Sequence, residues 1–223
     1  MMDVLMLRLR TFLAAVVAVV FVVGFSARAA GGAFDYYVLS LSWAPEFCEQ
    51  PGVAASHPHE CAAGRHIGFV VHGLWPRLNG GTLGANPESC GPAKSVSKGI
   101  VNSLTGAMPD AELVQRDWAL HGSCTGLAMN EYFTTLLLAR AAVQIPVQIS
   151  SITEGIQETP SQVEGQFAEA NPSFPKGAFR AVCEGGALTE VRACFDKDLK
   201  ARVCAVGAAG SCAETAFRVR PPR

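Results

Sequence analysis

Eight cysteines, all downstream of an apolar N-terminal stretch, constrain the fold of this chain more than any other feature. They occupy positions 48, 61, 90, 124, 183, 194, 204 and 212. An even number of cysteines behind an export signal is typical of a protein that folds in an oxidising compartment and pairs all of them. Because eight cysteines can pair in about a hundred ways, spacing alone does not choose the partners. The sequence therefore predicts a small domain held together by four disulfides.

The first 29 residues have the order of a secretory signal peptide. Arg8 and Arg10 precede an uncharged, mostly apolar run over 12–25, and small residues follow at 27–29. The apolar run is shorter than the roughly 20 residues that a membrane span needs, so an uncleaved anchor is the weaker alternative. We expect cleavage after Ala29 to leave one domain over 30–223, secreted or periplasmic and free of the membrane.

The charge of the chain bears on its partners. The whole chain carries 18 Lys and Arg against 19 Asp and Glu, and without the predicted signal peptide its net charge falls to about −3. Proteins that hold nucleic acid by neutralising its phosphates usually have a basic surface. The composition therefore favours a turnover enzyme with a local cationic patch over a protein that forms a stable complex with nucleic acid.

The apolar pattern predicts an α+β fold. Alternate residues are apolar in a strand expected over 34–43, which places four of them on one face: Tyr37, Leu39, Leu41 and Trp43. Further elements are expected as a short strand over 67–71 ending at His72, helices over 110–121 (capped by Asp110), 130–143 and 160–170, and strands over 179–183, 188–195 and 200–204. Strands and helices are grouped rather than alternating, which indicates a central antiparallel sheet flanked by helices in one domain.

Two short segments place a histidine directly before a glycine and near a tryptophan. They are His72–Pro76, with the sequence HGLWP, and Asp117–Cys124, with the sequence DWALHGSC. A single histidine at a strand end or before a helix-ending glycine is more often structural than catalytic. Two histidines in one cleft can instead act as a general base and a general acid, because their ordinary pKa of about 6.5 lies near working pH.

Together the two segments resemble the active-site segments of the ribonuclease T2 family. The first matches the family pattern at every position. The second keeps Trp118 and the run His121–Cys124, but it has Arg116, Asp117 and Leu120 where the family has His, Glu and Lys. The resemblance continues in family order through 34–48, Glu131–Phe133 and Leu188–Cys194.

This resemblance implies a metal-independent endoribonuclease without a cofactor. Such an enzyme cleaves single-stranded RNA by attack of the 2′-hydroxyl, through a 2′,3′-cyclic phosphate to 3′-phosphate ends. His121 would be the general base and His72 the general acid, and Asp117 would stabilise charge on the phosphate. Arg116, a permanent cation, is a candidate phosphate ligand. Trp75 has two readings, an exposed indole that stacks on a base or a core residue.

The resemblance also implies a disulfide pattern. It pairs Cys90 with Cys124, and it nests one pair inside another: Cys183–Cys212 around Cys194–Cys204. Cys48–Cys61 is then the pair that remains.

Two competing interpretations come from other classes of protein. The loss of the lysine at position 120 favours a weakened or inactive family member that serves as a secreted RNA-binding or interaction protein. His57 and His59 suggest metal ligands, but a disulfide cysteine beside loop histidines is the better reading of this cluster, whose spacing matches no common zinc pattern. We expect no bound metal, a single-stranded RNA substrate and a monomer.

Overall fold

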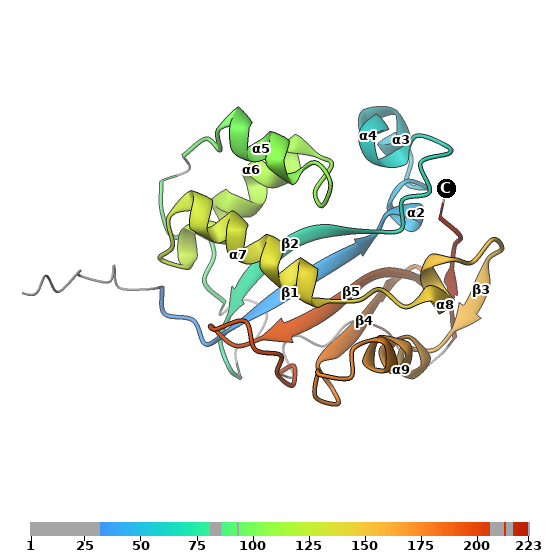
Figure 1. Ribbon diagram of the computed structural model, residues 1–223. Coiled ribbons are helices and arrows are strands. Elements are labelled where there is room, and N and C mark those ends of the chain that lie inside the picture. Colours follow the sequence, from blue (N-terminus) through green and yellow to red (C-terminus); the bar gives the residue numbers. More distant parts are fainter. Residues whose placement is uncertain (1–31, 81–85, 93, 206–211, 213–215, 223) are drawn as a thin grey trace, which may run out of the picture. The chain divides into compact units, whose positions relative to one another are not determined.

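The computed structural model describes residues 32–80, 86–92, 94–205, 212 and 216–222 (Figure 1). The predicted signal peptide lies outside these residues. At the centre is a six-stranded sheet of order β2-β1-β5-β6-β3, with β4 paired to β5. Among the described strands the pairings are antiparallel except for β5 with β6. The α+β expectation is confirmed, with a mixed sheet that is mostly antiparallel. None of the helices in these ranges is long and apolar enough to cross a membrane.

The strands are β1 (Tyr36–Trp43), β2 (Phe69–Arg77), β3 (Ile156–Glu158), β4 (Phe179–Glu184), β5 (Ala187–Phe195) and β6 (Phe217–Val219). The helices are α2 (Ala44–Phe47), α3 (Val53–Ser56), α4 (Pro58–Cys61), α5 (Lys98–Leu104), α6 (Ala111–Leu120), α7 (Met129–Ala142), α8 (Val147–Ser150) and α9 (Pro160–Ala170), and a 3-10 turn η1 covers Gly122–Cys124. The strand predicted over 200–204 is wrong, since only an isolated bridge joins Ala201 to Phe195. The short elements β3 and β6 escaped prediction because three residues are too few to show a period.

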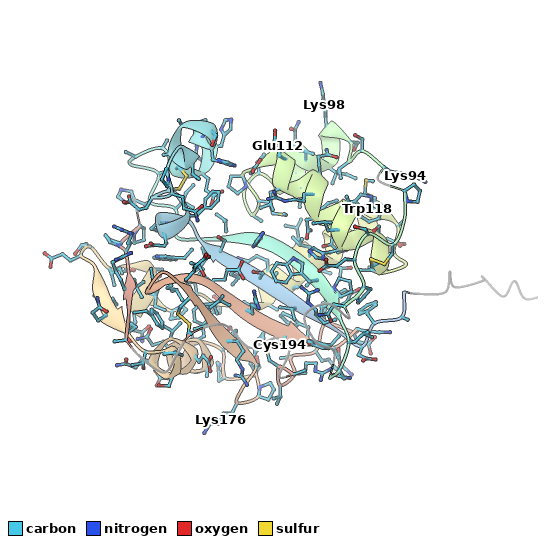
Figure 2. The ribbon with its side chains drawn as sticks, turned by 180° about the vertical axis from the view of Figure 1, so that it is seen from behind. Lys94, Lys98, Glu112, Trp118, Lys176 and Cys194 are labelled. Carbon is cyan, nitrogen blue, oxygen red and sulfur yellow. A yellow bond between two sulfur atoms is a disulfide. The ribbon has the colours of Figure 1, made fainter. Side chains whose placement is uncertain are left out.

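The predicted apolar face of β1 forms the core of the domain. Its alternate residues are buried in one cluster with side chains from α6, α7 and α9. Local signals fix where two of these helices begin. The Asp110 carboxylate accepts a hydrogen bond from the Glu112 N–H at the start of α6, and Thr159 and Gln162 form a capping box at the start of α9. Trp118, labelled in Figure 2, lies on α6 and is buried in the same cluster.

Strand β2 does not end at His72, which corrects the predicted boundary. It runs on to Arg77, and its pairing with β1 shifts between Ser40 and Leu41, so that Gly73 and Val71 have partners and His72 is the extra residue. This is a β-bulge. The bulge could not be predicted from the sequence, because the apolar run stops before His72. The pairing of β2 with β1 nevertheless continues beyond His72 and Gly73.

The disulfide pattern implied by the resemblance is confirmed. The bonded pairs are Cys48–Cys61, Cys90–Cys124, Cys183–Cys212 and Cys194–Cys204. The first closes the loop that carries α3 and α4, and the second fastens η1, just after α6, to the loop that precedes α5. Both loops lie beside the residues singled out by the sequence, so these two bonds hold the surroundings of the site.

Gly122 lies where α6 meets α7, and a side chain there has no room. A Cβ atom at this position would overlap Cε3 of Trp118 and lie 2.9 Å from Tyr132 Cδ1. Gly122→Ala is therefore expected to lower the free energy of unfolding by about 1–3 kcal/mol, the usual cost of overpacking a core. Thermal melting of the oxidised protein measures this as a drop of roughly 2–4 °C per kcal/mol.

Gly165→Ala is the matched control for this substitution. Gly165 lies inside α9, and a Cβ atom added there would meet nothing within 4 Å. Alanine at this position is therefore expected to raise stability by about 0.5–1 kcal/mol. Equal melting temperatures for the two variants would contradict the close packing described at Gly122.

Candidate active site

The candidate site lies on the sheet face opposite the core, around the side chain of Trp75. The His72 and His121 rings both contact this indole, each with its ring centroid 5.4 Å from the Trp75 centroid. The guanidinium carbons of Arg77 and Arg192 lie 5.0 and 5.2 Å from the same centroid. The fold therefore brings the two predicted histidines together, one from β2 and one from the end of α6.

His72 is held by a carboxylate that the sequence analysis did not identify. Its Nδ1 lies 2.7 Å from Oε1 of Glu190 on β5, and the other carboxylate oxygen accepts a hydrogen bond from Arg192 at 3.1 Å. Burial alone would raise the pKa of Glu190, but its hydrogen bond to His72 and the charges of His72 and Arg192 lower it below the ordinary value. Glu190 is therefore a partly buried carboxylate that fixes the orientation of the His72 ring.

His121 has a different environment. It is the residue that ends α6, only 9% exposed, and its Nδ1 is buried without a hydrogen-bond partner among the described residues. Burial lowers the pKa of His121 to about 3, and the charges of Arg77 and His72 act in the same direction. The imidazole is thus neutral near neutral pH.

Asp117 is turned into the interior. The Tyr132 hydroxyl lies 2.7 Å from Oδ2 of Asp117 and 2.8 Å from the carbonyl oxygen of Leu74. One hydroxyl proton cannot serve both acceptors. Burial raises the pKa of Asp117 to about 8, and a protonated carboxyl resolves the conflict, because it donates to Tyr132, which then donates to Leu74. The observed contacts of Asp117 are internal, and its predicted action on a phosphate stays a prediction.

Gly73 is required by this packing. A Cβ atom at position 73 would overlap Oδ1 of Asp117 and lie 2.5 Å from Nε1 of Trp75. The glycine after His72 thus lets α6 approach β2 closely enough to bring His121 to Trp75.

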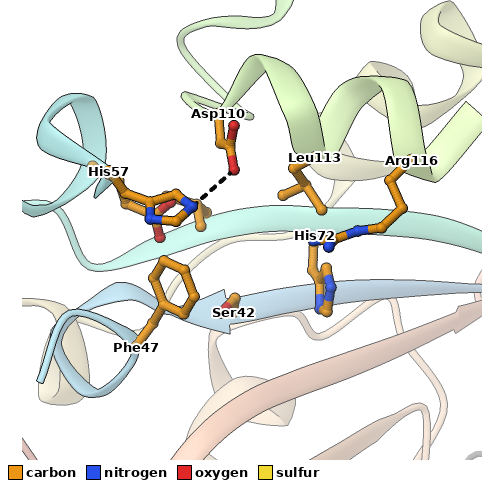
Figure 3. Close-up of a pocket in the computed structure, with 9 residues that line it drawn as sticks. Ser42, Phe47, His57, His72, Asp110, Leu113 and Arg116 are labelled. Carbon is orange, nitrogen blue, oxygen red and sulfur yellow. Dashed lines mark ion pairs between the residues drawn. The ribbon is translucent and has the colours of Figure 1, made fainter. Parts of the chain in front are cut away.

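Two cavities adjoin these groups. The smaller, of about 40 Å³, is bordered by both histidines and by Trp75, Leu113, Arg116, Asp117 and Leu120. The larger, of about 220 Å³, shares His72, Leu113 and Arg116 with it. Figure 3 shows the Arg116 side chain reaching from α6 toward His72. By contrast, Lys98 and Lys176 project away from the molecule (Figure 2).

The other candidate residues divide as follows. Trp75 is only 8% exposed, which matches the core reading of this side chain, and its stacking on a base stays a prediction. His57 lies 3.3 Å from the Asp110 carboxylate. Within the described ranges no three His, Cys, Asp or Glu side chains are grouped to hold a metal ion. The sequence did contain a sign of Glu190. Polar and apolar residues alternate along β5, so Glu190 lies on the same face as Arg192, opposite the face of the apolar Val191.

Comparison with known proteins gives the family. A probable ribonuclease of Haemophilus influenzae is 30% identical over 178 residues, which are 76% of this chain and 61% of that protein. A ribonuclease of Aeromonas hydrophila is 28% identical over 176 residues, 77% of this chain and 76% of that one. The solved structure of trichomaglin, an S-like ribonuclease, has the same fold with a TM-score of 0.65 at 22% identity, over 85% of this chain and 98% of that one. Residues 34–204 match the Ribonuclease T2 family, and the chain belongs to it.

Proposed function

We propose that this protein is a metal-independent endoribonuclease that cleaves single-stranded RNA. The observation that carries the proposal is the contact of two imidazoles with one indole, in two different environments. Burial keeps His121 unprotonated, which is the form that a general base must have before the reaction. His72 is hydrogen-bonded at Nδ1 to Glu190 and suits a general acid.

In the proposed reaction the RNA supplies its own nucleophile. His121 takes the proton of the 2′-hydroxyl, the 2′-oxygen bonds to phosphorus, and the bond from phosphorus to the 5′-oxygen breaks. His72 gives its proton to that leaving oxygen. Water then attacks the 2′,3′-cyclic phosphate with the two roles reversed, which yields a 3′-phosphate. Proton transfer of this kind typically contributes about 10²–10⁴-fold.

Arg116 is the candidate phosphate ligand in this scheme. Its side chain borders both cavities, and no carboxylate in the described part of the chain forms an ion pair with it. Leu120 lines the smaller cavity and adds no charge where the family has lysine. The missing charge favours the second candidate function, RNA binding with weak or no turnover. Because both histidines are present, we expect the first function, in an active enzyme that is slow for its family.

The remaining parts of the proposal concern the whole chain. Export by a signal peptide over 1–29 and release to the periplasm or the medium are supported by the four disulfides, because such bonds persist in oxidising compartments. A monomeric domain over 30–223 completes the proposal.

The first test is cleavage of RNA by the oxidised protein in excess EDTA. We expect RNA to be degraded and single-stranded DNA, which lacks the 2′-hydroxyl, to stay intact.

His72→Ala and His121→Ala are each expected to lose at least ~10²-fold in kcat while circular dichroism is unchanged. Activity that chelator removes, equal cleavage of DNA, or a loss under tenfold in either variant would contradict the mechanism.

The second test concerns Glu190 as a positioning residue. Glu190→Gln removes the charge beside His72 and is expected to lower kcat by about tenfold to a hundredfold, part of what acid catalysis supplies. The basic limb of the kcat–pH profile is expected to move to lower pH, with little change in KM. Glu164→Gln, which removes a carboxylate 3.4 Å from Arg180 away from the site, is the control. An unmoved pH profile would make Glu190 merely structural.

The third test concerns the protonation of Asp117. A carboxyl whose pKa rises from 3.8 to about 8 on folding contributes stability that is full below pH ~4 and is lost as pH rises through ~8. Asp117→Asn keeps a neutral donor without this loss. Urea unfolding is measured at pH 4.5 and 8.5 for both proteins. Between these pH values the free energy of unfolding of the variant is expected to rise relative to that of the parent, by on the order of a few kcal/mol. His121 titrates in both proteins and cancels, so parallel curves would mean that Asp117 is ionised when folded.

A further inference from the structure

The larger cavity beside His72 has the form of a subsite for one nucleobase. Its volume is about 220 Å³, below the roughly 300–1,000 Å³ of pockets for drug-sized ligands. The half-buried Phe47 ring and the His57 ring contact each other edge-to-face, with their centroids 5.2 Å apart, and form one end of the cavity. Figure 3 shows both facing the space that leads to His72. A partly exposed aromatic ring beside a catalytic group is a surface on which a base can stack.

Glu60 is a buried carboxylate in the wall of this cavity. The residue is 6% exposed and lines the space together with Ser42 and Val70. No described residue hydrogen-bonds to its carboxyl, and the neighbours that act on it, His57, Asp110 and His72, do so through charge alone. Burial raises the pKa of Glu60 to about 6, which leaves it ionised at neutral pH. Cys61, bonded to Cys48, anchors the residue. Both carboxyl oxygens therefore have acceptor capacity that a ligand in the cavity can use.

We propose that this cavity binds the base of the nucleotide that carries the leaving 5′-oxygen, and that the Glu60 carboxylate selects guanine there. The placement rests on the proposed function. His72, the proposed acid, borders this cavity, whereas His121, the proposed base, borders only the smaller one. The RNA nucleotide on the leaving-group side of the scissile phosphate therefore lies beside His72, in the larger cavity.

Guanine is the base whose donors match a carboxylate. Its N1–H and N2–H lie side by side on one edge, so the two oxygens of Glu60 can accept both hydrogen bonds. Adenine and cytosine present a donor beside an acceptor on that edge, and uracil presents one donor between two acceptors. An acceptor of the base that faces the ionised Glu60 is repelled and left unpaired, and burial makes that expensive.

Arg116 completes the subsite at its other end. Its guanidinium lies at the border that this cavity shares with the smaller one. A nucleotide bound with its base at Glu60 thus places its 5′-phosphate near a cation and near His72. The three groups divide recognition, with stacking on Phe47, hydrogen bonding to Glu60 and charge neutralisation by Arg116.

Binding of mononucleotides tests the proposal without requiring turnover. Isothermal titration of the oxidised protein with 5′-GMP, 5′-AMP, 5′-CMP and 5′-UMP is expected to show tightest binding of 5′-GMP, by about 5- to 100-fold, the range for a bidentate base contact. Glu60→Gln presents a donor beside an acceptor and is expected to abolish this preference. Glu60→Asp keeps the charge and is expected to keep the ranking at lower affinity. Glu154→Gln, which removes an exposed carboxylate, is the control.

Turnover of dinucleotides gives the second readout. UpG is expected to exceed UpA, UpC and UpU in kcat/KM. Glu60→Gln is expected to level the four, while the control Glu154→Gln keeps the ranking of the parent. Cleavage of all four at equal rates by the parent protein, or tightest binding of another nucleotide, overturns the guanine proposal and leaves the nuclease mechanism standing. Absence of cleavage with selective 5′-GMP binding overturns the proposed function and supports the binding site. If Glu60→Gln fails to fold, the ranking by the parent and by Glu60→Asp decides.

Discussion

The bulge at His72 is the feature on which the site depends. In a regular strand, residues three apart point to opposite faces of the sheet. The extra residue lets Val71 and Leu74 both enter the core, while Trp75 joins a cluster on the other face. His72 then reaches Glu190 across β1, the strand between them. The small Ser40 on β1, paired with Gly73 and Arg192 on its two sides, leaves room for this contact.

Burial then gives three ionisable groups of the site three different states. His121 loses its charge because nothing nearby compensates for desolvation. Glu190 is only partly exposed as well, yet it stays ionised because His72 and Arg192 bind it. Asp117 has only the Tyr132 hydroxyl as its side-chain partner and is favoured in the neutral form. One environment of low polarity thus produces a neutral acceptor, a fixed anion and a neutral donor, according to the partners of each group.

The sequence predicted those parts of the molecule that repeat or that belong to a recognised segment. The alternation of β1, the helices α6, α7 and α9, the disulfide pattern and the pairing of the two histidine segments all followed from it. Features that arise only from contact between distant segments did not. The bulge depends on register against β1, the Glu190 contact joins positions 118 apart, and the burial of Glu60 depends on a loop whose local sequence has no period.

The cationic character of the site explains how an acidic protein can act on a polyanion. Arg192 is held by Glu190, and Arg77 by Glu88 at 3.6 Å, and both lie over the Trp75 ring as fixed charges. Arg116 is exposed and has no ion-pair partner among the described residues, so its long side chain can follow a phosphate as the reaction proceeds. With Leu120 in place of lysine, attraction is local and modest. The small negative net charge of the chain offers RNA no broad attraction, which suits turnover better than sequestration.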